Sequence, residues 1–145
     1  MFTASYPAAF HPQQNRKGYW VSFPDLPEAL TGGDDLQDAF QQAADCLAEA
    51  IAGRIVRGDE VPVPSKPKRG QSLVGVPLYL APRLALYLAV RDNAVTRTSL
   101  AKKLGVSETV VRRMRNPKHD TKPEKIQAAL AALAKRLVVI LEDAA

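Results

Sequence analysis

The stretch from residue 97 to residue 116, RTSLAKKLGVSETVVRRMRN, constrains the fold more strongly than any other part of the chain. Thr98 and Ser107 are residue types that cap helices, and each precedes a short stretch with apolar residues at helical spacing. Gly105 stands between the two stretches, where a tight turn between helices requires a positive φ. The residues we expect to pack inside are Leu100, Ala101, Leu104, Val106, Val111 and Met114. The pattern predicts a helix-turn-helix, in which a small alanine lets the two helices cross closely.

The second of these helices carries the polar residues expected to read DNA. In a helix-turn-helix, outward-facing residues near the N-terminus of the second helix enter the major groove, and arginine can bond guanine through two donors. The residues predicted at this face are Ser107, Glu108, Thr109, Arg112, Arg113 and Asn116. The residues predicted to contact phosphates are Thr98, Lys102, Lys103, Arg115, Lys118 and Lys122. The plainer alternative is that the three arginines only form a solvated helix face.

This mode of DNA binding implies a symmetric assembly, because one helix-turn-helix contacts only half of an operator. We therefore expect a homodimer or a higher even oligomer on double-stranded operator DNA. The most apolar stretch of the chain, residues 130–141 (LAALAKRLVVIL), either completes the core or pairs across the two-fold axis. Residues 138–140 are β-branched and suit a short strand between subunits, so both interpretations stay open.

The first 80 residues carry strand patterns. Residues 2–10 alternate, with aromatic and small apolar side chains on one face, and residues 19–23 are aromatic and β-branched, which predicts a hairpin. Residues 29–33 form a further short extended stretch. Residues 73–80 are expected to be a returning strand, at a sheet edge because of Pro77.

A long helix is expected between these strands. Asp34 or Asp35 can cap it, and it would run to about Arg57 with Gly58 as its C-cap. The expected apolar face consists of Leu36, Phe40, Ala43, Leu47, Ala50 and Ile51. One helix on one face of a small sheet is enough for a minimal core.

The second part of the chain is helical throughout. From Pro82 onward the patterns predict four helices, the last of them starting at Pro123. The sequence therefore predicts an α+β chain in two domains. A small α/β layer occupies residues 1–80, and an all-α helix-turn-helix domain for DNA binding and dimerisation occupies residues 81–145.

Charge also divides the chain into two parts, at residue 65. Residues 1–65 hold four basic and nine acidic residues, a net charge of −5, whereas residues 66–145 hold 16 basic and 6 acidic residues, a net charge of +10. The basic part suits a polyanion such as nucleic acid, and the acidic part suits a basic protein. The alternative is that the two surfaces simply differ in charge.

The chain offers little for catalysis or metal binding. Its two histidines, His11 and His119, fall in different predicted domains, whereas a metal site or a His-based triad needs several partners close together. Cys46, the one cysteine, is expected to be a buried or half-buried thiol in the long helix. We predict no catalytic residue, metal ligand or cofactor. No apolar run reaches the roughly 18 residues of a membrane span, and residues 1–10 lack a secretion-signal pattern, so we expect a cytoplasmic protein without membrane contact.

Four stretches carry a resemblance to a known family: YPAAF at residues 6–10, GYWVSFPDLPEALTGGDDLQDAFQQAADCLAEAI at 18–51, VPVPS at 61–65 and VPLYLAPRLA at 76–85. With the helix-turn-helix, the chain resembles the HicB family of antitoxins over essentially its whole length. The resemblance implies a partial RNase H-like fold in the first domain, without nuclease activity. It also implies that this domain neutralises a small basic HicA-like toxin, an mRNA-cleaving ribonuclease. The second domain would bind the operon's own promoter and repress it.

The resemblance implies a toxin-binding surface on the first domain, whose acidity suits a basic toxin because complementary charge speeds association. The residues expected to contact the toxin are Tyr19, Trp20, Phe23, Asp25, Leu26, Glu28, Asp34 and Asp35. In the plainer interpretation the aromatic residues are core, and the acids are solubilising loop residues or helix caps.

Two other functions compete with this one. An active RNase H-like nuclease is disfavoured, because residues 2–10 hold no acid for a two-metal site. The alternative function is a stand-alone helix-turn-helix transcriptional repressor with an N-terminal ligand-sensing or dimerisation domain.

Overall fold

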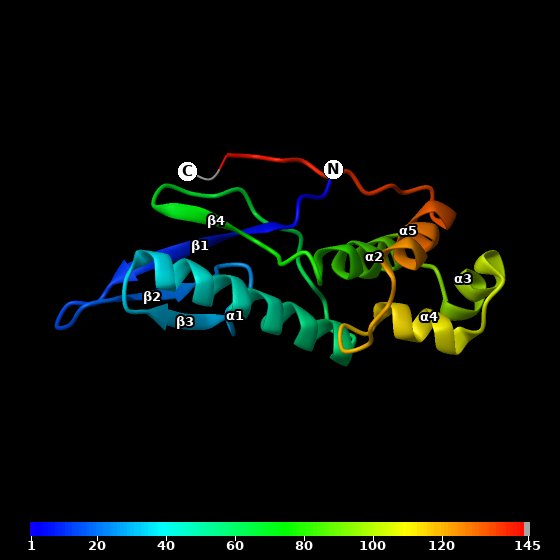
Figure 1. Ribbon diagram of the computed structural model, residues 1–145, viewed down its shortest axis with the longest axis horizontal. Helices are drawn as coiled ribbons and strands as arrows, with labels where there is room; N and C mark the ends of the chain where they lie inside the picture. The colour runs from blue at the N-terminus through cyan, green and yellow to red at the C-terminus, as the bar shows by residue number, and fades with distance from the viewer. Residues whose placement is uncertain (144–145) are drawn as a thin grey trace.

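The first part of the chain folds as a four-stranded antiparallel sheet with one long helix across a face (Figure 1). The computed structural model describes residues 1–143. The strands are β1 (Ser5–Pro12), β2 (Tyr19–Ser22), β3 (Leu30–Gly33) and β4 (Gln71–Gly75), in the order β3-β2-β1-β4, and the helix is α1 (Leu36–Arg57). The predicted hairpin of β1 and β2 is confirmed, with His11 opposite Trp20 in the register. The α+β class is confirmed as well.

Helix α1 begins and ends where its capping residues predicted. Asp35 is the N-cap and accepts a hydrogen bond of 2.8 Å from a backbone N–H of the first turn, and Gly58 is the C-cap. A Cβ at Gly33 would lie 2.4 Å from the backbone nitrogen of Ala39, so the close approach of β3 to α1 requires glycine there. The buried residues of α1 are Ala39, Ala43, Leu47, Ala48, Ile51 and Ile55. The prediction for Leu36 is wrong, because the buried face begins at Ala39 and leaves Leu36 47% exposed.

The returning strand β4 is shorter than predicted, since it ends at Gly75 rather than at residue 80. The N–H of Val76 still donates to the carbonyl of Ala4 at 2.9 Å, but Pro77 has no N–H with which to continue the ladder. The Pro77 carbonyl instead accepts the N–H of Leu80, which starts the next helix. β4 lies at an edge of the sheet, as predicted, because it pairs with β1 alone.

Four helices follow: α2 (Ala81–Asp92), α3 (Arg97–Leu104), α4 (Glu108–Arg115) and α5 (Pro123–Ala132). We call the sheet with α1 the first module and α3–α5 the second module. Helix α2 contributes to the cores of both. Its residues in the first core are Leu84, Tyr87 and Leu88. Its residues in the second core are Leu86, Ala89 and Val90. The predicted domain boundary between residues 80 and 81 therefore falls at the start of a helix that the two modules share.

The apolar C-terminal stretch divides into a buried and an exposed part. Leu130 and Leu133 are buried in the second core, so this part completes that core. Residues 135–143 form neither helix nor strand. The exposed apolar residues of this segment are Leu137, Val138, Val139, Ile140 and Leu141. Residues 144 and 145 of the predicted second domain lie outside the described residues.

Candidate nucleic-acid interface

A tight turn at Gly105–Ser107 joins α3 to α4. Gly105 closes α3 with φ +67°, a left-handed conformation that favours glycine. Ser107 caps α4, its hydroxyl accepting the N–H of Val110 at 3.3 Å, as predicted. The N-cap of α3, however, is Thr96 and not Thr98. Thr96 has the extended backbone of a cap and accepts the N–H of Ser99 at 3.1 Å, whereas Thr98 lies inside the first turn.

The buried side of this unit is largely as predicted. The residues buried in the second core are Leu100, Ala101, Val111 and Met114, and Leu104 packs against them partly buried. The prediction for Val106 is wrong, since its side chain is 36% exposed. Its backbone N–H donates to the carbonyl of Ala101 at 3.0 Å as part of the turn that closes α3, and this leaves the side chain at the surface.

The opposite face of α4 is polar, basic and exposed. The exposed residues of the predicted groove face are Ser107, Glu108, Thr109, Arg112, Arg113 and Asn116. The exposed residues of the predicted phosphate set are Thr98, Lys102, Lys103, Lys118 and Lys122. The structure thus brings these side chains to the surface around one short helix. Such an arrangement can offer hydrogen-bond donors to base edges and positive charge to phosphates.

Besides Ser107, the N-cap of α4, two residues of the predicted groove face have partners within the chain. The Glu108 carboxylate accepts a hydrogen bond from the Thr98 hydroxyl and so ties the start of α4 to α3. The Asn116 side-chain oxygen accepts the N–H of Lys118 at 2.9 Å, and its carbonyl accepts a hydrogen bond from Arg83. Arg83 is buried in α2, and burial lowers the pKa of its guanidinium. Sequence reasoning missed this contact, because an arginine in the first turn of a helix gives no sign that it will be buried.

Arg115 does not share the outer face of α4 with the other two arginines. Its guanidinium carbon lies 5.4 Å from the centre of the Tyr87 ring, a cation–π contact. Its Nε is buried, and it is the buried side-chain polar atom that has no hydrogen-bond partner among the described residues. Burial lowers the pKa of this guanidinium. The prediction of Arg115 as an outward phosphate contact is therefore corrected: it packs against α2.

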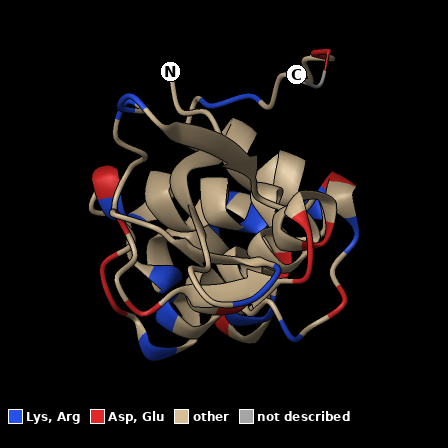
Figure 2. Ribbon diagram, turned by 90° about the vertical axis from the view of Figure 1, so that its left-hand side faces the viewer, with Lys and Arg blue, Asp and Glu red and all other residues tan. Residues whose placement is uncertain are grey.

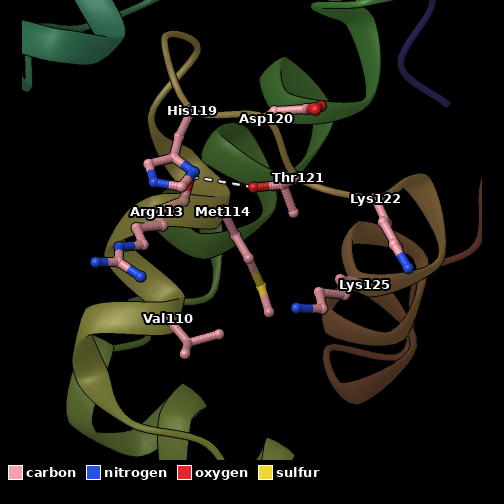
Figure 3. Close-up of a pocket in the computed structure, with 8 residues that line it drawn as sticks. All are labelled: Val110, Arg113, Met114, His119, Asp120, Thr121, Lys122 and Lys125. Atoms are coloured by element: carbon pink, nitrogen blue, oxygen red, sulfur yellow. Dashed lines mark hydrogen bonds between the residues drawn. The ribbon is translucent and has the colours of Figure 1, made fainter.

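Two hollows flank α4. The first, of about 260 Å³, lies between α4 and the start of α5 (Figure 3). Its charged and titratable lining residues are Arg113, His119, Asp120, Lys122 and Lys125, and the Thr121 hydroxyl donates to the Arg113 carbonyl at 3.4 Å. The second, of about 510 Å³, lies between the end of α1 and α4. Its charged lining residues are Arg57, Arg97, Arg112 and Arg115. Sequence reasoning did not connect Arg57 or Lys125 with this interface.

The structure divides the predicted toxin-contacting residues into three groups. Phe23 and Leu26 are buried in the first core, so the prediction that they stand at a contact surface is corrected in favour of a core role. The residues at the start of α1 and the facing end of β2 are Tyr19, Trp20, Asp34 and Asp35. Asp25 and Glu28 lie elsewhere: Asp25 accepts hydrogen bonds from Ser65, and Glu28 pairs with Arg54 in the last turn of α1.

The group at the start of α1 holds three of the four exposed members of the set, Trp20, Asp34 and Asp35, and Glu28 is the fourth. Trp20 is 45% exposed and stacks on His11, with ring centres 3.8 Å apart, while Tyr19 is half-buried against the first core. Asp34 is exposed, and Asp35 is occupied as the helix cap. In the view from the hairpin end (Figure 2), Lys and Arg are seen as well as Asp and Glu, and at this end itself Arg16 and Lys17 lie between β1 and β2. This end therefore offers an aromatic surface beside acidic groups rather than a uniformly acidic face.

The described residues hold no group of three or more His, Cys, Asp or Glu side chains arranged to bind a metal. Cys46 is a half-buried thiol, as predicted, and burial raises its pKa. None of the helices within residues 1–143 has the length and apolar character needed to cross a membrane.

Comparison with known proteins identifies the class of protein. Residues 5–85 match the family described as HicB_like antitoxin of bacterial toxin-antitoxin system. The match extends over the first module to the start of α2. The chain belongs to this family, so it is an antitoxin and not an enzyme, and the predicted resemblance is confirmed.

Individual relatives match most of the chain. Antitoxin HicB 1 of Photorhabdus laumondii is 34% identical, and the match covers 94% of this chain and 86% of that one. Antitoxin HicB of Escherichia coli K12 is 32% identical, with 94% of this chain and 98% of that one covered. Among solved structures, antitoxin HicB of Burkholderia pseudomallei is 20% identical with a TM-score of 0.44, over 72% of this chain and 94% of that one.

Proposed function

We propose that the chain has two activities: it neutralises a HicA-like, mRNA-cleaving ribonuclease toxin, and it represses its own operon by binding promoter DNA. The observation that supports the proposed DNA-binding activity is the structure of α4. It is capped by Ser107 after the left-handed Gly105 and fixed to the second core by Val111 and Met114. Its exposed face presents Arg112, so that a base-reading side chain stands on a rigid element.

Measuring the affinity of the chain for a duplex from its own promoter tests the proposed DNA-binding activity. Arg112→Ala and Arg113→Ala should each weaken the complex by about 1–3 kcal/mol and relax the sequence preference, if these side chains read bases. Arg16→Ala, which removes an exposed arginine from the β1–β2 hairpin, is the matched control. Unchanged affinity in both α4 variants would remove them from the set of base contacts.

In this proposal the first module carries the toxin-neutralising activity. Residues 1–65, which hold β1, β2, β3 and α1 but not β4, carry a net charge of −5, which favours fast association with a basic protein. The exposed Trp20 and Asp34 lie together at one end of the sheet and are the contact residues that we favour. In a cleavage assay with purified toxin and mRNA, the wild-type chain should inhibit, and Trp20→Ala with Asp34→Lys should inhibit more weakly. Equal inhibition by the wild-type chain and the double variant would show that the toxin contacts another surface of the chain.

We propose a homodimer or a higher even oligomer as the DNA-binding form. Leu137, Val139 and Leu141 are exposed on a segment without helix or strand structure, directly after the module that would need a two-fold partner. Pairing of this segment with its copy in a second chain would cover it. The two proposed partners, an mRNA-cleaving toxin and promoter DNA, place the chain in the cytoplasm.

A further inference from the structure

The two hollows beside α4 lie on opposite sides of its exposed face. Arg112 and Arg113 are consecutive, so their side chains leave the helix about 100° apart. Arg113 lines the hollow next to α5, together with Lys122 and Lys125 (Figure 3). Arg112 lines the hollow next to the end of α1. The exposed face of α4 is therefore bordered by a positively charged hollow on each side.

Both hollows have the charge of anion-binding sites. In the first, three side chains of lysine and arginine oppose one carboxylate, that of Asp120. In the second, the exposed arginines Arg57, Arg97 and Arg112 line the hollow beside the half-buried Arg115, and Asp59 pairs with Arg57. This positive charge on both sides of α4 suits two anionic partners, one on each side of the helix.

The major groove of DNA supplies such a pair of partners. The groove is about 12 Å wide and a helix with its side chains is about 10–12 Å across, so a helix lying in the groove has one phosphate backbone on each side. We infer that the two hollows seat the two phosphate backbones that border the groove, and that Arg57 of the first module contacts one of them. This inference rests on the proposed function, in which α4 enters the major groove.

Arg57 is suited to this contact although it belongs to α1. It lies in the last turn of α1, with 57% of its side chain exposed, and it lines the same hollow as Arg112. Its Nε donates to Asp59 at 2.7 Å, which leaves the terminal nitrogens for an anion. Since both partners of this pair are exposed, the pair itself is weak and does not compete strongly with a phosphate. The first module then takes part directly in DNA binding.

The salt dependence of DNA binding tests the inference with the full-length chain. A variant that binds one phosphate fewer should show a slope of log Kd against log salt concentration that is shallower by about 0.9. For Arg57→Gln and for Lys125→Gln, the loss of affinity between 0.05 and 0.2 M salt should thus be about three- to four-fold smaller than for wild type. The weakening should be the same on promoter DNA and on an unrelated duplex, because phosphates carry no sequence information.

Arg16→Gln is the control, because it removes one exposed positive charge from the β1–β2 hairpin, which Figure 1 places at the far end of the molecule from α4. Its slope should equal that of wild type. Thermal melting of each variant checks that the fold is kept. If Arg57→Gln or Lys125→Gln behaves like Arg16→Gln, its hollow does not seat a backbone and the inference is overturned. If the wild-type chain binds neither duplex, the proposed DNA-binding function fails together with it.

Discussion

Leu86 lies on the face of α2 that belongs to the second core, and its side chain is fully buried. Replacement by alanine removes buried apolar surface and leaves a cavity, which typically costs about 2–5 kcal/mol. With a loss of about 3 kcal/mol and a urea dependence of about 2 kcal/mol per M, the unfolding midpoint should fall by about 1.5 M.

This loss should reach the first module as well, because α2 is shared. On its other face Leu84 is fully buried in the first core, and the Tyr87 hydroxyl donates to the Asp59 carbonyl at 2.6 Å. We therefore expect both modules to unfold in one transition. Trp20, the one tryptophan of the chain, lies on β2 and reports the first module by its fluorescence, while far-UV circular dichroism reports the helices of both.

In urea titrations of Leu86→Ala, the two signals should move together to the lower midpoint. Leu78→Ala is the matched control: Leu78 is 86% exposed, so the same chemical change should alter the free energy of unfolding by less than about 0.5 kcal/mol. The reasoning is refuted if the Trp20 transition of Leu86→Ala stays at the wild-type midpoint while the dichroism signal falls earlier. The modules would then fold independently.

Three further predictions concern a salt bridge, a helix cap and the C-terminal segment. Hydrogen bonds from Arg54 lower the pKa of Glu28 from 4.5 to about 2, so this pair stabilises the fold above about pH 4.5 and loses its effect as the pH falls towards 2. Because both side chains are partly exposed, Glu28→Gln should lower the free energy of unfolding by only about 1 kcal/mol in urea titrations at pH 7. An equal loss at pH 2 would contradict a stabilising role of the ionised Glu28–Arg54 pair. Ser107→Ala should lower the free energy of unfolding by about 1 kcal/mol and weaken promoter binding, whereas unchanged stability would mean that the cap contributes nothing. Val139→Asp should convert the homodimer to monomer in sedimentation, and a variant that stays dimeric would place the interface elsewhere.

Local sequence signals predicted the elements whose geometry is set by neighbouring residues. The caps Asp35, Gly58 and Ser107, and the turn at Gly105, depend on backbone geometry within a few residues, and the structure places them as expected. The prediction of Thr98 as the N-cap of α3 was wrong. Thr96 and Thr98 are of the same residue type and stand two residues apart, so the choice between them depends on where the chain leaves α2.

The direction of individual side chains was harder to predict where it depends on packing between modules. Arg115 follows Val111 by four residues, which places both on the same side of α4, so its inward direction could have been read from the sequence. Phe23 and Leu26 belong to a loop, where no periodicity distinguishes core from surface. The second hollow, lined by Arg57 and Arg112, could not be predicted, because its shape depends on how α2 orients the second module against the end of α1.

A growth assay tests the central claim most directly. The small reading frame beside this gene is expressed in cells with the wild-type chain, with the Arg112→Ala, Arg113→Ala double variant, or with neither, and mRNA integrity is followed. Our account predicts that the neighbour alone arrests growth and degrades mRNA, and that both forms of the chain restore growth because α4 is not needed for neutralisation. A neighbour that is harmless, or harmful but rescued by neither form, would contradict the account.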